Sequence, residues 1–147
     1  MISLTDKCPS PRPHHATLTL PWEQRTRSRL RVVLDDGREA GLFLKRGTIL
    51  RENDLLVSKD GAVVVRIHAA EEPLSVVTSD VPLLMARVCY HLGNRHTPLA
   101  ILPGRVHYLQ DPVLDRMVQG LGLAVIRENG PFEPEMGAYA DEGHHHG

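Results

Sequence analysis

Hydrophobic and polar residues alternate with a period of two through much of the first half of the chain, which is the pattern of half-buried β-strands. Two turn signals, Asp-Asp-Gly at 35–37 and Lys-Asp-Gly at 59–61, each lie between two apolar runs. An Asp-Gly pair flanked by such runs is typical of a β-hairpin. No helical period of any length interrupts this stretch. The pattern therefore predicts a small all-β domain of two or more hairpins over residues 17–72.

The second half of the chain combines a strand pattern with a helical one. Glu71-Glu72-Pro73 breaks the alternation, and we interpret it as a domain boundary. Beyond it, the spacing of apolar residues predicts two helices, capped by Asp80 and Asp111. Four short apolar runs predict strands over residues 74–78, 99–102, 105–109 and 123–126. The order β-α-β-β-α-β indicates a ferredoxin-like domain over residues 73–135, so we expect an α+β protein.

Both ends of the chain lack these patterns. Residues 1–16 contain three closely spaced prolines and predict a flexible N-terminus. Residues 136–147 form a short polar segment with three histidines, and we expect a disordered tail there. Two domains of roughly 55 and 60 residues bury little core on their own, so we also expect the protein to form an oligomer.

Composition and charge exclude several classes of protein. Seventeen Lys and Arg residues balance eighteen Asp and Glu residues, which leaves no bulk positive field for nucleic acid or an anionic membrane. Two cysteines exclude a disulfide-dense scaffold and a four-thiolate zinc site. No apolar run approaches the roughly 18–20 residues of a membrane helix, and the N-terminus has no signal-peptide core. We therefore expect a cytoplasmic protein that binds neither nucleic acid nor a membrane.

Histidine is unusually frequent, with nine residues that outnumber all the Phe, Tyr and Trp residues together. This favours metal or proton chemistry. His96 follows the first predicted helix on a loop, and near the two-fold axis of a dimer its two copies would supply two ligands to one ion. His144, His145 and His146 are either tethered extra ligands or the remnant of an expression tag. His107, in a predicted strand, is either an auxiliary ligand or a plain strand residue.

A second interpretation rests on arginine. Arg25, Arg27, Arg29 and Arg31 recur every second residue, so in a strand all four would lie on one face. Such a face is either solvated or a docking surface for an acidic protein segment. The alternative function is therefore a protein-docking module whose tail binds divalent metal incidentally. An enzyme is not expected, because hydrolase and phosphate-loop motifs are absent and Asp80 stands where a ferredoxin-like acyl-phosphate hydrolase needs an anion-binding loop.

Several motifs occur in a fixed order: Thr-Leu-Pro-Trp-Glu at 19–23, Gly-Leu-Phe-Leu at 41–44, Tyr-His-Leu-Gly-Asn-Arg-His at 90–96 and Pro-Phe-Glu-Pro-Glu at 131–135. With them the sequence resembles the family of urease accessory nickel metallochaperones, the UreE family. The resemblance implies a β-rich peptide-binding domain, a ferredoxin-like metal-binding domain and no enzymatic activity. It further implies a homodimer that binds Ni(II) at its interface and delivers it to the urease assembly GTPase and the urease apoprotein complex.

The resemblance also assigns metal ligands. The family's central ligand corresponds to His96, contributed by both chains, and its tail histidines correspond to residues 144–146. Some members carry further histidines after the tyrosine that corresponds to Tyr108, where this chain has leucine, glutamine and proline at 109, 110 and 112. Because these side chains do not replace imidazole and His107 is an unproven substitute, we expect few ions per dimer. Zn(II) or Cu(II) is expected to compete with Ni(II).

Overall fold

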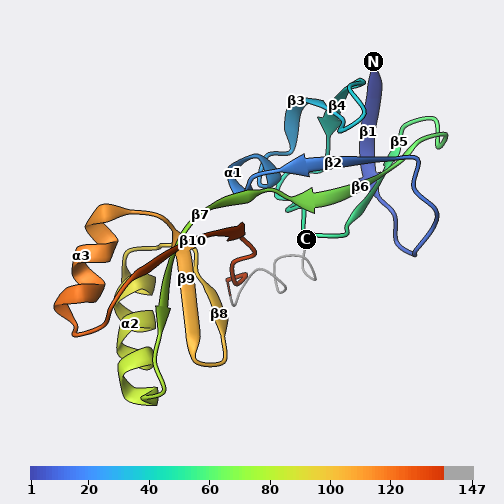
Figure 1. Ribbon diagram of the computed structural model, residues 1–147. Coiled ribbons are helices and arrows are strands. Elements are labelled where there is room, and N and C mark those ends of the chain that lie inside the picture. Colours follow the sequence, from blue (N-terminus) through green and yellow to red (C-terminus); the bar gives the residue numbers. More distant parts are fainter. Residues whose placement is uncertain (138–147) are drawn as a thin grey trace. The chain divides into compact units, whose positions relative to one another are not determined.

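The computed structural model describes residues 1–137 of the chain (Figure 1). The chain divides into two compact units, which meet in the sequence between Glu71 and Glu72. Each unit has a sheet of its own, six-stranded in the first and four-stranded in the second. The predicted α+β class is confirmed. From residue 138 onward the predicted tail lies outside the described residues.

The first unit contains six strands and one short helix. They are β1 (Ile2–Lys7), β2 (Ala16–Leu20), α1 (Trp22–Arg25), β3 (Arg29–Val33), β4 (Glu39–Phe43), β5 (Leu55–Ser58) and β6 (Val64–Ala69). The sheet order is β2-β6-β5-β1-β4-β3. Antiparallel pairing of β3 with β4 and of β5 with β6 confirms the two predicted hairpins. Their turns contain Gly37 and Gly61 at φ of 93° and 76°, a conformation that glycine adopts without steric cost.

Strand β1 corrects the predicted flexible N-terminus. β1 lies inside the sheet, parallel to β4 and antiparallel to β5, and Leu4 is completely buried. The prediction was wrong because it rested on the three prolines, which fall in the connection between β1 and β2. The apolar alternation of Ile2 and Leu4 is too short to identify a strand. What holds this strand is pairing with distant residues such as Ala40 and Ser58, and a local pattern does not reveal that.

Arg25 corrects the predicted four-arginine strand face. Pro21 starts a single helical turn, α1, so Arg25 lies on a helix rather than a strand. Its side chain is completely buried. Nε donates to the carbonyl oxygen of Leu20 at 3.1 Å and Nη1 to that of Leu50 at 3.2 Å, while the guanidinium stands 5.3 Å from the centroid of the Trp22 ring. Arg25 therefore fastens α1 to the end of β2 and to the loop before β5.

The other three arginines of the predicted face do not all lie on one strand either. Arg27 follows α1 and forms an ion pair with Glu23, one helical turn earlier. Arg29 and Arg31 do lie on β3, where both are exposed and occupy alternate positions. The predicted face of four therefore reduces to two residues.

The second unit has the predicted β-α-β-β-α-β order. Its elements are β7 (Glu71–Thr78), α2 (Pro82–Asn94), β8 (Ala100–Leu102), β9 (Arg105–Leu109), α3 (Pro112–Gly120) and β10 (Ile126–Pro131). The sheet order is β10-β7-β9-β8, which places the first and third strands of the unit in the middle. Val88 and Leu92 of α2 and Val118 of α3 share one buried core with Val106 and Tyr108 of β9. Both helices therefore pack on the same face of the sheet.

Some element ends differ from the prediction. Residues 71–73 belong to β7 rather than to a break between elements. Helix α2 is preceded by Val81 and has no side-chain cap, whereas Asp111 caps α3 as predicted. The last strand begins at Ile126, because Leu123 is buried in the helix-facing core instead of pairing in the sheet. Among the described residues, no helix has the length and apolarity needed to cross a membrane.

Candidate metal centre

His96 lies on the tight turn that follows α2. Its amide donates to the carbonyl oxygen of Gly93 at 2.9 Å, and the amide of Arg95 donates to that of Leu92 at 3.1 Å. The backbone of His96 is left-handed, with φ of 57°, a conformation in which histidine is enriched among the non-glycine residues. The side chain is exposed. The helix end thus holds the backbone in place while the imidazole faces solvent, as the sequence predicts.

Among residues 1–137, the surroundings of His96 offer few other ligands. A shallow pocket of about 300 Å³ is lined by Arg95, His96, Thr97, Pro98, Leu109, Asp111, Leu114 and Phe132. Its one carboxylate, Asp111, accepts the amides of Val113 and Leu114 through Oδ1. Within residues 1–137, no three His, Cys, Asp or Glu side chains are close enough together to hold a metal ion. A single copy of the described chain therefore supplies one imidazole here and no complete ligand set.

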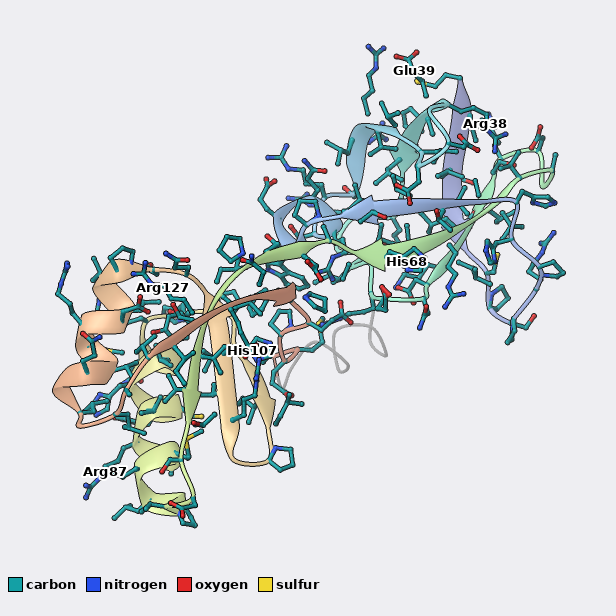
Figure 2. All side chains as sticks on the ribbon, in the orientation of Figure 1. Arg38, Glu39, His68, Arg87, His107 and Arg127 are labelled. Atoms are coloured by element: carbon teal, nitrogen blue, oxygen red, sulfur yellow. The ribbon has the colours of Figure 1, made fainter. Side chains whose placement is uncertain are left out.

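His107 is placed differently. It lies on β9 (Figure 2 labels His107) and is almost completely buried. Its ring is edge-on to Phe132 at a centroid distance of 6.0 Å. Arg105 Nε contacts its Nδ1 at 3.5 Å. Burial and the charge of Arg105 lower the pKa of His107, against the opposing effect of Glu128. His107 lines a groove of about 540 Å³ that does not include His96, so the structure does not bring these two candidate ligands into one pocket.

The remaining histidines divide between described and undescribed residues. His144, His145 and His146 lie outside the described residues. In the first unit, His68 Nδ1 lies 3.1 Å from an oxygen of Glu52, and His15 Nδ1 accepts the amide of Val64 at 3.0 Å (Figure 2 labels His68). His91 is half-buried on α2, edge-on to Tyr90. Each of these rings therefore has a local contact, and none of them lines the pocket of His96.

The second unit contains a buried polar pair that sequence reasoning missed. The Tyr108 hydroxyl donates to Asp115 Oδ1 at 2.7 Å, and both side chains are buried. Burial and the Asp115 carboxylate raise the pKa of Tyr108. Leu109 and Leu114, each next to one member of the pair, line the pocket of His96. The pair therefore joins β9 to α3 through residues that are next in sequence to two of the pocket residues. A tyrosine in a strand and an aspartate seven residues later carry no local signal of such a contact.

Comparison with known proteins identifies the family. Residues 4–70 match the model for the UreE urease accessory protein, N-terminal domain, and residues 72–147 match the model for its C-terminal domain. The chain is 56% identical to the urease accessory protein UreE of Alkalilimnicola ehrlichii over 95% of this chain and 85% of that one. It is 54% identical to UreE of Citrobacter koseri over 100% and 98% of the two chains. The chain belongs to the UreE family of urease accessory proteins.

Proposed function

We propose that this chain is a nickel metallochaperone: a homodimer that binds Ni(II) through His96 of both copies and delivers it to the urease assembly complex. The observation that carries the proposal is the exposed imidazole of His96 on a fixed turn, in a pocket without a complete ligand set among the described residues. Such a site requires ligands from a second copy or from another segment. Membership of a family of urease accessory proteins supports urease as the destination.

The chemistry of the donors suits transfer rather than storage. Two exposed imidazoles bind a divalent ion without enclosing it, and His144, His145 and His146 would add tethered ligands that are easily exchanged. Imidazole accepts Ni(II), Zn(II) and Cu(II), and Cu(II) binds more tightly than Ni(II) in the usual order. Selectivity for nickel then comes from metal availability and from the partners that receive the ion. These partners are the urease assembly GTPase and the urease apoprotein complex, and no catalytic step is required of this chain.

The pH dependence follows from the same donors. An imidazole nitrogen binds a metal only when it carries no proton. The affinity for Ni(II) is therefore expected to fall as the pH is lowered, because protons compete with the ion. The proposal leaves His107 out of this site, because His107 is buried and lines a different groove.

Calorimetric titration with Ni(II), paired with native mass spectrometry, tests the proposal. The samples are the intact chain, His96→Ala, His96→Asn and a chain ended at Glu142; asparagine tolerates the left-handed backbone of residue 96. His14→Ala, an exposed histidine in the first unit, is the matched control. We expect both His96 variants to remain dimeric and lose the tight site, the truncation to lower the number of ions, and the control to change nothing.

The opposite pattern would support the other candidate function. If truncation removes all binding while the His96 variants bind as the intact chain does, the tail alone captures metal. The protein would then be a docking module with incidental metal binding, and the exposed Arg29 and Arg31 on β3 would be its most prominent feature.

A further inference from the structure

The outer face of β3 and β4 carries apolar and cationic side chains together. We call Met1, Arg29, Arg31, Val33 and Phe43 the β3–β4 patch. Pairing places Arg29 opposite Phe43, Arg31 opposite Gly41 and Val33 opposite Glu39. Met1, Val33 and Phe43 are exposed by 69%, 59% and 41% of their surface. Large apolar side chains that are exposed beside one another are a common mark of an interaction surface.

Gly41 lets the aromatic ring of the patch lie on the sheet. A Cβ atom at Gly41 would stand 2.7 Å from a ring carbon of Phe43 and 3.5 Å from the terminal carbon of Met1. Because glycine has no such atom, the ring covers the strand and presents its other side outward. The guanidinium of Arg29 lies 5.8 Å from the ring centroid, within the range of a cation–π contact. The patch is thus an ordered surface rather than a set of separate side chains.

The patch has cations that no carboxylate neutralises within the described residues. Arg29 and Arg31 form no ion pair there, in contrast to Arg27 and Arg38, which pair with Glu23 and Asp36. On an extended strand, residues two apart point to the same face and stand roughly 7 Å from each other. An extended peptide presents acidic side chains at the same spacing. Arg29 and Arg31 therefore match two carboxylates in an acidic-x-acidic sequence.

A groove continues from the patch. It has a volume of about 930 Å³ and is lined by Met1, Ile2, Ser3, Arg38, Glu39, Ser58, Lys59, Asp60 and Val63 (Figure 2 labels Arg38 and Glu39). Asp60 already accepts the Ser58 hydroxyl and the amide of Ala62, whereas Lys59 adds a cation without an ion pair in the described part. Glu39 and Asp60 are the carboxylates of this lining that oppose an acidic ligand, because hydrogen bonds from neutral donors leave the charge of Asp60 in place. The cations and the apolar side chains together nevertheless favour one class of partner.

We propose that the β3–β4 patch and its groove dock an extended acidic segment of a partner protein, in which two acidic residues two apart are followed, two positions on, by an apolar residue. The carboxylates pair with Arg29 and Arg31, and the apolar side chain packs on Val33, the next outward residue of β3. This surface belongs to the first unit and does not depend on nickel binding. Arg29 and Arg31 are the two residues of the predicted four-arginine face that lie on β3.

Fluorescence anisotropy with a labelled peptide tests the proposal. The probe is Gly-Ser-Glu-Ser-Glu-Ser-Leu-Ser-Gly, and the comparison peptide has lysine in place of both glutamates. The intact chain is expected to bind the acidic probe, more weakly as salt increases, and to bind the lysine peptide at least tenfold more weakly. The charge-reversal variant Arg29→Glu/Arg31→Glu is expected to bind the lysine peptide more tightly than the acidic probe. Val33→Ser is expected to weaken binding without changing the charge preference.

A matched variant separates docking from bulk charge. Arg12→Glu/Arg116→Glu makes the same change in net charge at two exposed positions that are not part of the patch. It is expected to bind the acidic probe as the intact chain does. The proposal is overturned if the intact chain does not bind the probe at millimolar concentration. It is equally overturned if reversal at Arg29 and Arg31 leaves the preference intact or if the matched variant weakens binding as much. An unchanged circular dichroism spectrum and an unchanged thermal unfolding transition show that each variant remains folded. This control requires no metal and keeps the test independent of the metal proposal.

Discussion

Removal of the Tyr108 hydroxyl should destabilise the second unit alone. Tyr108→Phe keeps the ring and leaves no cavity, so its effect isolates one hydrogen bond. That bond, 2.7 Å long, is made to a carboxylate on the first turn of α3. Within the described part of the chain, the other oxygen of Asp115 is buried without a hydrogen-bond partner and forms an ion pair with Arg127 Nη2 at 3.6 Å (Figure 2 labels Arg127). Loss of the hydroxyl therefore leaves a buried carboxylate without its hydrogen bond from Tyr108.

The size of the effect follows from this environment. A hydrogen bond to a charged group contributes about 1.5–3 kcal/mol, and a buried acceptor that loses its donor bears its full desolvation cost. Arg127 is well exposed, so solvent screens its attraction to Asp115 and limits what it can replace. We therefore expect the free energy of unfolding of the second unit to fall by about 2 kcal/mol. Since 1.36 kcal/mol is a factor of ten, protection from hydrogen exchange should fall about 30-fold.

Hydrogen exchange followed by mass spectrometry measures both units in one experiment. The slowest amides of β9 and α3 should lose protection, whereas those of β4 and β5 should not change. Tyr90→Phe is the matched control, because Tyr90 is 64% exposed. The double variant Tyr108→Phe/Asp115→Leu should recover much of the loss, since replacing both partners leaves no buried charge unpaired. A change below twofold in Tyr108→Phe, or an equal change in both units, would refute the reasoning.

Three further predictions concern caps and titration in the second unit. Asp111→Ala removes the cap of α3 and should cost about 1 kcal/mol in urea unfolding, whereas Asp111→Asn should cost less. The pKa of His107 is lowered in the folded state, so the folded protein binds this proton less readily than the unfolded chain does. The free energy of unfolding should therefore fall as the pH drops below about 6.5. His107→Gln should reduce this pH dependence in unfolding measured from pH 5 to 8. The pKa of Tyr108 is raised in the folded state, so its hydroxyl should stabilise the fold fully below a pH of about 10 and progressively less above it. The difference in free energy of unfolding between the intact chain and Tyr108→Phe should therefore shrink in alkaline solution.

The sequence predicts an element well where one local signal sets its boundary. Asp-Gly turns define the two hairpins of the first unit, and Asp111 followed by Pro112 defines the start of α3. Strand β1 escapes prediction because two apolar residues do not make a pattern and its partners are distant in the chain. Strand β10 is displaced because the apolar run at 123–126 serves partly as a core contact beneath the helices.

In the candidate site, too, the sequence predicts local features and misses tertiary contacts. The loop position and exposure of His96 follow from the end of the helical pattern, which is local. His107 and His96 line different grooves, and the alternation of residues along a strand does not predict which groove a side chain lines. The Tyr108–Asp115 pair depends on how α3 packs on β9, a tertiary contact. Sequence reasoning therefore identified the exposed candidate ligand and missed the buried Tyr108–Asp115 pair.

A substitution at Arg25 tests whether this buried charge stabilises or destabilises the first unit. A buried cation loses hydration, and replacing one by an apolar side chain of similar size is sometimes neutral or stabilising. Here, however, the guanidinium donates to two carbonyl oxygens that belong to different segments, and each such bond contributes about 1.5–3 kcal/mol. Arg25→Met should therefore lower protection from hydrogen exchange in β2 and β5 by at least 30-fold and leave α3 unchanged, the reverse of the pattern in Tyr108→Phe. Arg27→Met, in an exposed ion pair, should change neither unit measurably. An unchanged or more stable Arg25→Met variant would mean that desolvation outweighs both hydrogen bonds, and that α1 is held by the packing of Trp22 rather than by the buried arginine.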